Sequence, residues 1–324
     1  MYAPVIRKIT RSNKVLVERA LPEDGKLLVK EKEVIQPFDK LGTCKAVRSE
    51  IVLPQDFKPS FKGKIAKTIE GVKIGKSKGK KVVAPFSGSL FVKNNQWVLR
   101  GQKSEFTLLS GVWGIVEKIL SSRSVLIRSQ MKDVLTPIAT GGSCEGELVV
   151  FPNPSILLLD SFLEKFTKDA YGKIFYVGYN VGLNVLKKAK KLGARGILSG
   201  SVTKEAYTYA KKEKFSLGVF EGFGKIDTSS QVFNELKAVS NRFVFFDQED
   251  CRLRIPVPKE FKTTSGTKSV IKVVRKGYWV QIFQVPHFGA IGEVDSVGEG
   301  SILVKVSSGK KPVEVSLPNF FIVE

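Results

Sequence analysis

Side chains that could carry out chemistry are few in this chain, and the densest group lies near position 250. Asp247, Glu249 and Asp250 stand close together and are followed by Arg252 and Arg254. Three carboxylates at this spacing could hold a divalent cation. Carboxylates beside arginines, however, more often form a surface ion-pair network. We therefore expect ion pairs here and no metal.

The only histidine, His287, lies between Pro286 and Phe288. Histidine is the side chain that most readily transfers protons near pH 7, and catalytic triads and most metal-dependent hydrolases require it. The sequence therefore favours a protein that binds without catalysing a reaction, and it indicates no cofactor.

Three glycine-bearing segments, 178–182, 199–203 and 221–225, follow apolar runs and could approach an anion through free backbone N–H groups. They contain neither a dinucleotide fingerprint nor a phosphate loop, because 222–225 lacks the required spacing and the following Ser or Thr. The glycines could instead serve turn geometry, and Ser201 or Thr203 could cap a helix. The candidate ligand-binding residues are Gly178, Gly182, Glu221, Gly222 and Gly224.

The charge balance is strongly basic. Lys and Arg number 53 against 31 Asp and Glu, which gives a formal net charge of +22 over 324 residues. This excess favours a polyanionic partner, with nucleic acid as the leading candidate, although a basic surface can also serve solubility alone.

The segment 58–81 concentrates this charge, since it holds nine lysines against the single acid Glu70. Its four glycines predict a flexible loop that could follow a phosphate backbone and release counterions. The alternative is a solvated connector.

Further basic residues lie on an expected helix, 183–192, and near aromatic residues of the last fifty positions. Bases stack on exposed rings while cations contact phosphates. The candidate nucleic-acid-binding residues are Lys73, Lys76, Lys78, Lys80, Lys81, Lys187, Lys188, Lys190, Lys191, Arg275, Lys276, Tyr278, His287, Lys310 and Lys311.

The elements that must position these residues fall into three regions. Residues 1–150 alternate short apolar runs with tight turns, which predicts a β-rich region that includes the loop 58–81. Residues 151–258 predict a small doubly wound α/β domain, and residues 268–324 predict a separate β-module. The expected α/β strands are 156–159, 174–177, 196–199, 217–220 and 243–246, and the expected helices are 183–192, 204–213 and 230–239.

Residues 268–324 carry a recognisable pattern. A strand containing Tyr278 and Trp279 reaches a turn with Gly289 and Gly292 before the next strand. This pattern resembles the KOW domains of NusG-type transcription elongation factors and some large-subunit ribosomal proteins. The resemblance implies an SH3-like barrel that docks on RNA, the ribosome or RNA polymerase. Tyr278 and Trp279 must lie on opposite faces, and Trp279 and Phe288 are candidates for the core.

Residues 21–30 and 34–42 resemble half of a lipoyl-like barrel-sandwich hybrid, and 83–90, 111–117 and 139–148 resemble a companion half. In a swinging-arm carrier, a lysine at a hairpin tip would bear the cofactor. Lys132 belongs to Met131-Lys132, the only available Met-Lys pair of the chain, but its neighbours do not fit that role. The whole arrangement is similar to bacterial proteins that join such modules.

Cys44, Cys144 and Cys251 lie about a hundred residues apart, without paired spacing, and are expected to be reduced and buried. We find no signal-peptide core and no apolar run of the roughly 20 residues needed to span a bilayer, and therefore expect a cytoplasmic protein without membrane contact.

The sequence thus predicts a non-catalytic protein that binds RNA or a ribonucleoprotein or RNA polymerase complex. Two alternatives stay open. The chain could be a structural subunit that assembles with itself or with a larger complex, or the α/β domain could sense a small anionic ligand.

Overall fold

The computed structural model describes residues 1–47, 50–93, 95–156, 163, 170–258, 269–306 and 311–324. The chain divides into two compact units. Unit 1 comprises Met1–Val15, Gly111–Trp113 and Ser129–Glu324, and unit 2 comprises Leu16–Ser110 and Gly114–Arg128. The expected richness in β-structure with some helix is confirmed, and the domain boundaries expected at residues 150 and 258 stay a prediction.

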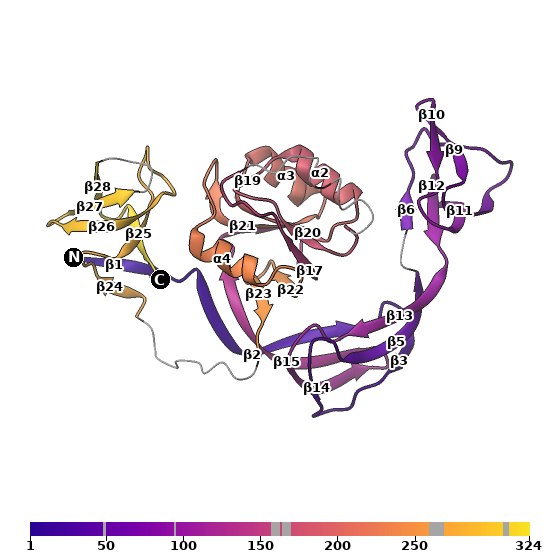
Figure 1. Ribbon diagram of the computed structural model, residues 1–324, viewed down its shortest axis with the longest axis horizontal. Coiled ribbons are helices and arrows are strands. Elements are labelled where there is room, and N and C mark those ends of the chain that lie inside the picture. Colours follow the sequence, from indigo (N-terminus) through magenta and orange to yellow (C-terminus); the bar gives the residue numbers. More distant parts are fainter. Residues whose placement is uncertain (48–49, 94, 157–162, 164–169, 259–268, 307–310) are drawn as a thin grey trace. The chain divides into compact units, whose positions relative to one another are not determined.

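The central sheet of unit 1 contains four parallel strands in the order β21-β20-β18-β17 (Figure 1). They are β17 (Cys144–Val150), β18 (Ile174–Tyr176), β20 (Gly196–Val202) and β21 (Ser216–Phe223). Shorter or antiparallel strands flank them: β16 (Ile138–Thr140), β19 (Asn180–Val181), β22 (Phe243–Asp247) and β23 (Arg252–Pro256). The sequence assigned 144–150 to the first β-rich region, whereas β17 belongs to this sheet. Of the expected strand 156–159, only Ile156 is described, and it lies in a bend.

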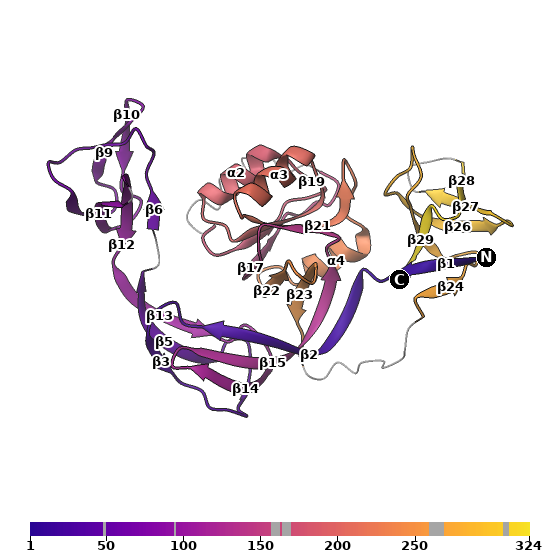
Figure 2. The same ribbon diagram turned by 180° about the vertical axis from the view of Figure 1, so that it is seen from behind.

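Three helices are described, and each lies within one residue of its expected span: α2 (Leu183–Lys191), α3 (Lys204–Lys212) and α4 (Ser230–Ala238). Helices α2 and α3 cover one face of the sheet through Val185, Leu186 and Ala206, and α4 covers the other face through Val232 and Leu236 (Figure 2). None of these helices is long and apolar enough to cross a membrane.

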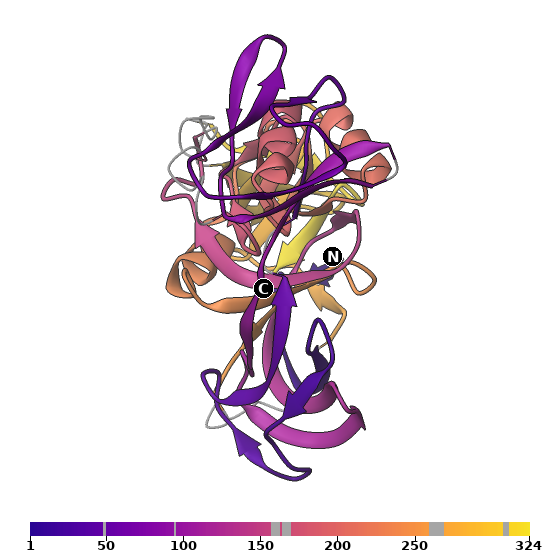
Figure 3. The same ribbon diagram turned by 90° about the vertical axis from the view of Figure 1, so that its right-hand side faces the viewer.

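A second sheet of unit 1 has the order β24-β1-β29-β25-β26-β27-β28. Its strands are β1 (Tyr2–Ile6), β24 (Ile271–Val273), β25 (Trp279–Ile282), β26 (Ile291–Val297), β27 (Ser301–Val306), β28 (Val313–Ser316) and β29 (Phe320–Val323). Strand β1 pairs in parallel with β29, so both termini lie in one sheet (Figure 3). The sequence had placed residues 1–6 with the first β-rich region. Below, this sheet is called the C-terminal sheet.

Unit 2 is made of short antiparallel strands. One sheet contains β3 (Gly25–Leu27), β5 (Lys40–Val47) and β13 (Lys103–Leu109), and β4 (Val34–Ile35) pairs with β14 (Gly114–Ser121). A second contains β6 (Glu50–Val52), β8 (Ile65–Thr68), β11 (Gly88–Lys93) and β12 (Gln96–Gly101), and a third contains β7 (Lys58–Pro59), β9 (Lys73–Ser77) and β10 (Lys80–Val83). The boundary between the units falls within β2 (Ile9–Ala20) and β15 (Ser124–Leu135).

Candidate nucleic-acid interface

The lysine-rich segment of unit 2 is ordered. Residues 58–81 form β7, β8, β9 and the start of β10, so the expected flexible loop is wrong. A hydrophobic core explains the order, because Phe57, Ile74, Leu90 and Leu99 are buried together beneath these strands. Trp97 closes the core through an edge-to-face contact with Phe57, at 6.2 Å between ring centroids.

The register of this sheet aligns three lysines in one row. Lys76 of β9 lies directly opposite Lys58 of β7 on one side and Lys81 of β10 on the other. Directly opposed residues share a face of a sheet, with neighbouring strands about 4.8 Å apart. All three side chains are exposed, and within the described residues no carboxylate pairs with them. We call Lys58, Lys76 and Lys81 the lysine row.

A tight turn connects β9 and β10, the two strands that carry Lys76 and Lys81 of the lysine row. Lys78 and Gly79, with φ of 47° and 74°, join β9 to β10, as in two-residue hairpins whose central residues both have positive φ. Asp56 holds the turn, since its carboxylate accepts hydrogen bonds from the Lys78 backbone N–H at 2.5 Å and from Ser77 Oγ at 3.0 Å. These bonds lower the pKa of Asp56. Lys73 and Lys80 are also exposed on this hairpin.

The lysines of α2 have other partners. Lys190 Nζ pairs with Glu213 Oε2 at 2.8 Å, and Lys187 Nζ lies 5.8 Å from the ring centroid of Tyr209. Lys188 is half-buried and Lys191 is exposed. The structure therefore gives this helix fewer available cations than the sequence suggested.

The candidate nucleic-acid-binding residues of the C-terminal sheet differ in exposure and in ion pairing. Arg275 and Lys311 are exposed, and Lys276 Nζ lies 3.7 Å from Asp295 Oδ1. Lys310 lies outside the described residues. Tyr278 packs against the core, whereas Trp279 is 51% exposed.

The structure therefore places neither candidate for the core there, since Phe288 is also 52% exposed. Alternation along the strand predicts that Tyr278 and Trp279 lie on opposite faces of the sheet, but it does not predict which of the two side chains faces the core. Trp279, His287 and Phe288 all line one cavity, which the segment 225–231 closes on its other side. The sequence had placed His287 and Phe288 near each other but missed Trp279 and Lys225.

The three glycine-bearing segments meet at the carboxyl ends of the parallel strands, where they bond to one another. Asn180 Nδ2 donates to Ser201 Oγ at 3.0 Å and also to the Gly224 carbonyl. Gly200 N–H donates to the Gly178 carbonyl at 3.0 Å. Thr203 caps α3 by accepting a hydrogen bond from Ala206 N–H, as expected for one of the two candidates. These contacts occupy polar groups that a ligand would otherwise meet.

The other ligand-binding candidates have structural partners or open surroundings. Gly182 stands at the N-cap of α2 with open space around it, and Gly222 is buried within β21. The Glu221 carboxylate is buried: its Oε1 accepts the Ser229 N–H at 3.0 Å, and its Oε2 contacts Lys8 Nζ and Gln281 Nε2. The sequence gave no sign of these partners, because they lie far away along the chain.

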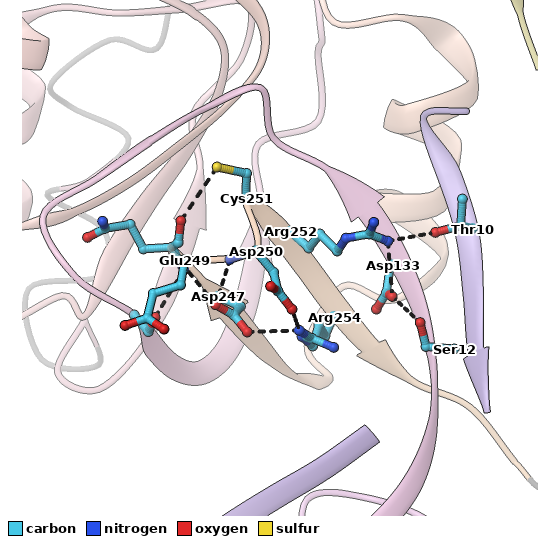
Figure 4. A network of polar contacts seen from close by, with 11 residues as sticks. Thr10, Ser12, Asp133, Asp247, Glu249, Asp250, Cys251, Arg252 and Arg254 are labelled. Atoms are coloured by element: carbon cyan, nitrogen blue, oxygen red, sulfur yellow. Dashed lines mark hydrogen bonds and ion pairs between the residues drawn. The ribbon is translucent and has the colours of Figure 1, made fainter. Parts of the chain in front are cut away.

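The acidic cluster forms the expected ion pairs, as Figure 4 shows. Arg254 pairs with Asp247 at 2.9 Å and with Asp250, while Arg252 reaches Asp133 at 3.4 Å. Across the described parts of the chain, no group of three or more His, Cys, Asp or Glu side chains is placed to hold a metal ion.

The other residues singled out for their reactivity are the three cysteines and Lys132. The three cysteines are free thiols; Cys44 is buried, and Cys144 and Cys251 are half-buried. Lys132 lies within β15 rather than at a hairpin tip, and its Nζ pairs with Glu235 at 2.5 Å.

Comparison of the chain with protein-family models and with curated proteins gave no match.

Proposed function

We propose that this protein binds RNA without catalysing a reaction on it, and that it docks on RNA, the ribosome or RNA polymerase. The observation that carries this proposal is the lysine row. Neighbouring strands about 4.8 Å apart bring Lys58, Lys76 and Lys81 within one Debye length of about 10 Å, so their fields add. Like charges placed directly opposite one another destabilise a sheet, and a polyphosphate backbone along the row would offset that repulsion.

The strand order of the C-terminal sheet supports the same function. Strands β29, β25, β26, β27 and β28 follow one another as antiparallel neighbours, which agrees with the proposed SH3-like, KOW-type module. Parallel strands with helices on both faces support a doubly wound α/β domain beside it. The short sheets of unit 2 support a barrel-sandwich arrangement.

The proposal is tested by replacing the row with Lys58→Gln, Lys76→Gln and Lys81→Gln in one variant. Fluorescence anisotropy with a labelled single-stranded RNA, over a series of salt concentrations, gives the slope of log affinity against log salt. Each phosphate contact contributes about 0.7 to that slope for single strands, so losing three should flatten it by about 2.

The matched control removes three lysines that already have carboxylate partners: Lys103→Gln, Lys173→Gln and Lys305→Gln. It changes net charge by the same amount, and its slope should stay close to that of the wild-type protein. An unchanged slope in the row variant, or equal flattening in both variants, would contradict the proposal.

A further inference from the structure

A cavity of about 860 Å³ lies within unit 1, between the segment 225–231 and the C-terminal sheet. The sheet contributes Trp279 and the turn 286–291, and the other wall is the turn that leads from β21 into α4. Its volume falls within the range of about 300–1,000 Å³ that holds small molecules or a single group of a larger one. Of the three glycine-bearing segments, 221–225 contributes Lys225 to its lining, and the lysine row lies elsewhere, in unit 2.

Direct contacts fix its two walls to each other. Gly289 has φ of +83° and lies so close to Ile226 that an added Cβ would come within 2.7 Å of Ile226 Cδ1. Nearby, Gln281 Nε2 donates to the buried Glu221 at 3.2 Å. The cavity is therefore formed before any ligand arrives, which reduces the entropy lost on binding.

Exposed aromatic rings line the cavity. Trp279 shares a face of β25 with Gln281, because side chains alternate along a strand, and that face is the one that contacts Glu221. Phe288 is held by an edge-to-face contact with Phe283, with 5.7 Å between ring centroids. Phe288 is thus half exposed yet held in place, and Trp279 offers a second half-exposed ring to the same cavity. Nucleic-acid bases stack on exposed rings of this kind without regard to sequence.

The charges in the cavity favour a neutral ring over a phosphate. Lys225 and Asp227 are both exposed and carry opposite charges. Glu324 also lines the cavity, where Lys272 and Arg7 pair with it and lower its pKa. Because Glu324 is already paired with two cations, the exposed charges of Lys225 and Asp227 offset each other and give a phosphate no cluster of cations to bind. A base can instead donate its amino protons to the Asp227 carboxylate.

We infer that this cavity holds one unpaired base of a bound RNA, stacked on Trp279, and that the protein therefore prefers single-stranded to double-stranded RNA. A base within a duplex is already paired and stacked, and cannot enter. The inference rests on the proposed function. In RNA binding, the lysine row would supply affinity for phosphates, and the cavity would add a stacking contact that salt does not weaken.

The test compares Trp279→Ala with Trp279→Phe in the full chain, using the same labelled RNA as a single strand and as a duplex. Losing one stacked base should weaken single-strand binding about tenfold. The salt slope should stay unchanged because no phosphate contact is lost, and duplex binding should not move. Trp279→Phe should retain most of the affinity, and Phe38→Ala, an 85% exposed aromatic residue of unit 2, serves as the control.

The outcomes separate the inference from the proposed function. If Trp279→Ala and Phe288→Ala both bind single strands as the wild-type protein does, while the lysine-row variant loses its slope, the cavity inference is overturned and the proposed function stands. If the wild-type protein binds no RNA at low salt, both are overturned. A thermal midpoint within a few degrees of wild type establishes that each exposed-site variant is folded.

Discussion

Gln281, on the C-terminal sheet, donates a hydrogen bond of 3.2 Å to Glu221, at the end of a parallel strand sixty positions earlier in the chain. The same carboxylate contacts Lys8 and accepts the backbone N–H of Ser229. Both charged side chains are buried, with Lys8 exposed by only 4% and Glu221 by 0%. One carboxylate thus joins the N-terminal segment, the parallel sheet, the start of α4 and the C-terminal sheet.

Removing the charge of Glu221 should destabilise unit 1. The change Glu221→Gln keeps the shape of the side chain but leaves the Lys8 ammonium buried without a counter-charge, which costs about 3 kcal/mol. The same substitution at Glu213, whose pair with Lys190 is exposed, should cost less than about 1 kcal/mol. Urea-induced unfolding measures both values.

Combining Lys8→Met with Glu221→Gln should restore much of the lost stability, because no unpaired charge then remains buried. If Glu221→Gln is no more harmful than Glu213→Gln, the carboxylate does not hold these segments together.

The lysine row predicts a conflict between stability and binding. Lys76→Glu places a carboxylate between Lys58 and Lys81, so repulsion on both sides becomes attraction. The hairpin should gain roughly 0.5 kcal/mol at low salt, while RNA binding weakens. Amide hydrogen exchange across residues 73–83 measures the local gain.

Lys80→Glu is the matched control, since Lys80 lies opposite Ser77 rather than opposite a lysine. It reverses the same charge on the same hairpin and should bring no such protection. Equal changes in exchange for the two variants would show that the opposed lysines do not repel one another across the sheet.

The local elements could be predicted well from the sequence. The three helices were predictable to within a residue because apolar spacing and a capping threonine mark them directly: Val185, Leu186 and Ala189 form the buried face of α2, and Thr203 caps α3. What the sequence could not supply was the assignment of strands to sheets. The run 144–150 looks like any short strand, and only its pairing with β18 and β22 makes it part of the central sheet.

The candidate site shows the same limit. Composition indicated a basic segment, but the row of Lys58, Lys76 and Lys81 depends on the pairing of β7 with β9, which no local pattern specifies. The alternation of Tyr278 and Trp279 could be predicted, but the burial of the Gln281 amide against Glu221, on the Trp279 face, could not. Partners distant in sequence decided both cases.

Cys144 predicts a pH dependence at the alkaline end. Burial raises the pKa of its thiol to about 11, against an opposing hydrogen bond from Ser216. An unfolded thiol loses its proton near pH 8.5, so between about pH 9 and 11 the unfolded state releases a proton that the folded state keeps. The stability that this thiol contributes should therefore be fully present below pH 8 and fall through this window, by about 3 kcal/mol at pH 11.

The variant Cys144→Ala should lack this part of the alkaline loss, and Cys251→Ala, which removes a half-buried thiol from the turn before β23, should retain it. Urea-induced unfolding at pH 8 and pH 10.5 gives the comparison for each protein. Alkylation by iodoacetamide at pH 8.5 adds a direct measure, because a protonated thiol reacts slowly: Cys144 should be protected in the folded protein and modified quickly in urea. Rapid modification in the folded protein would show that the thiol ionises near its ordinary pKa.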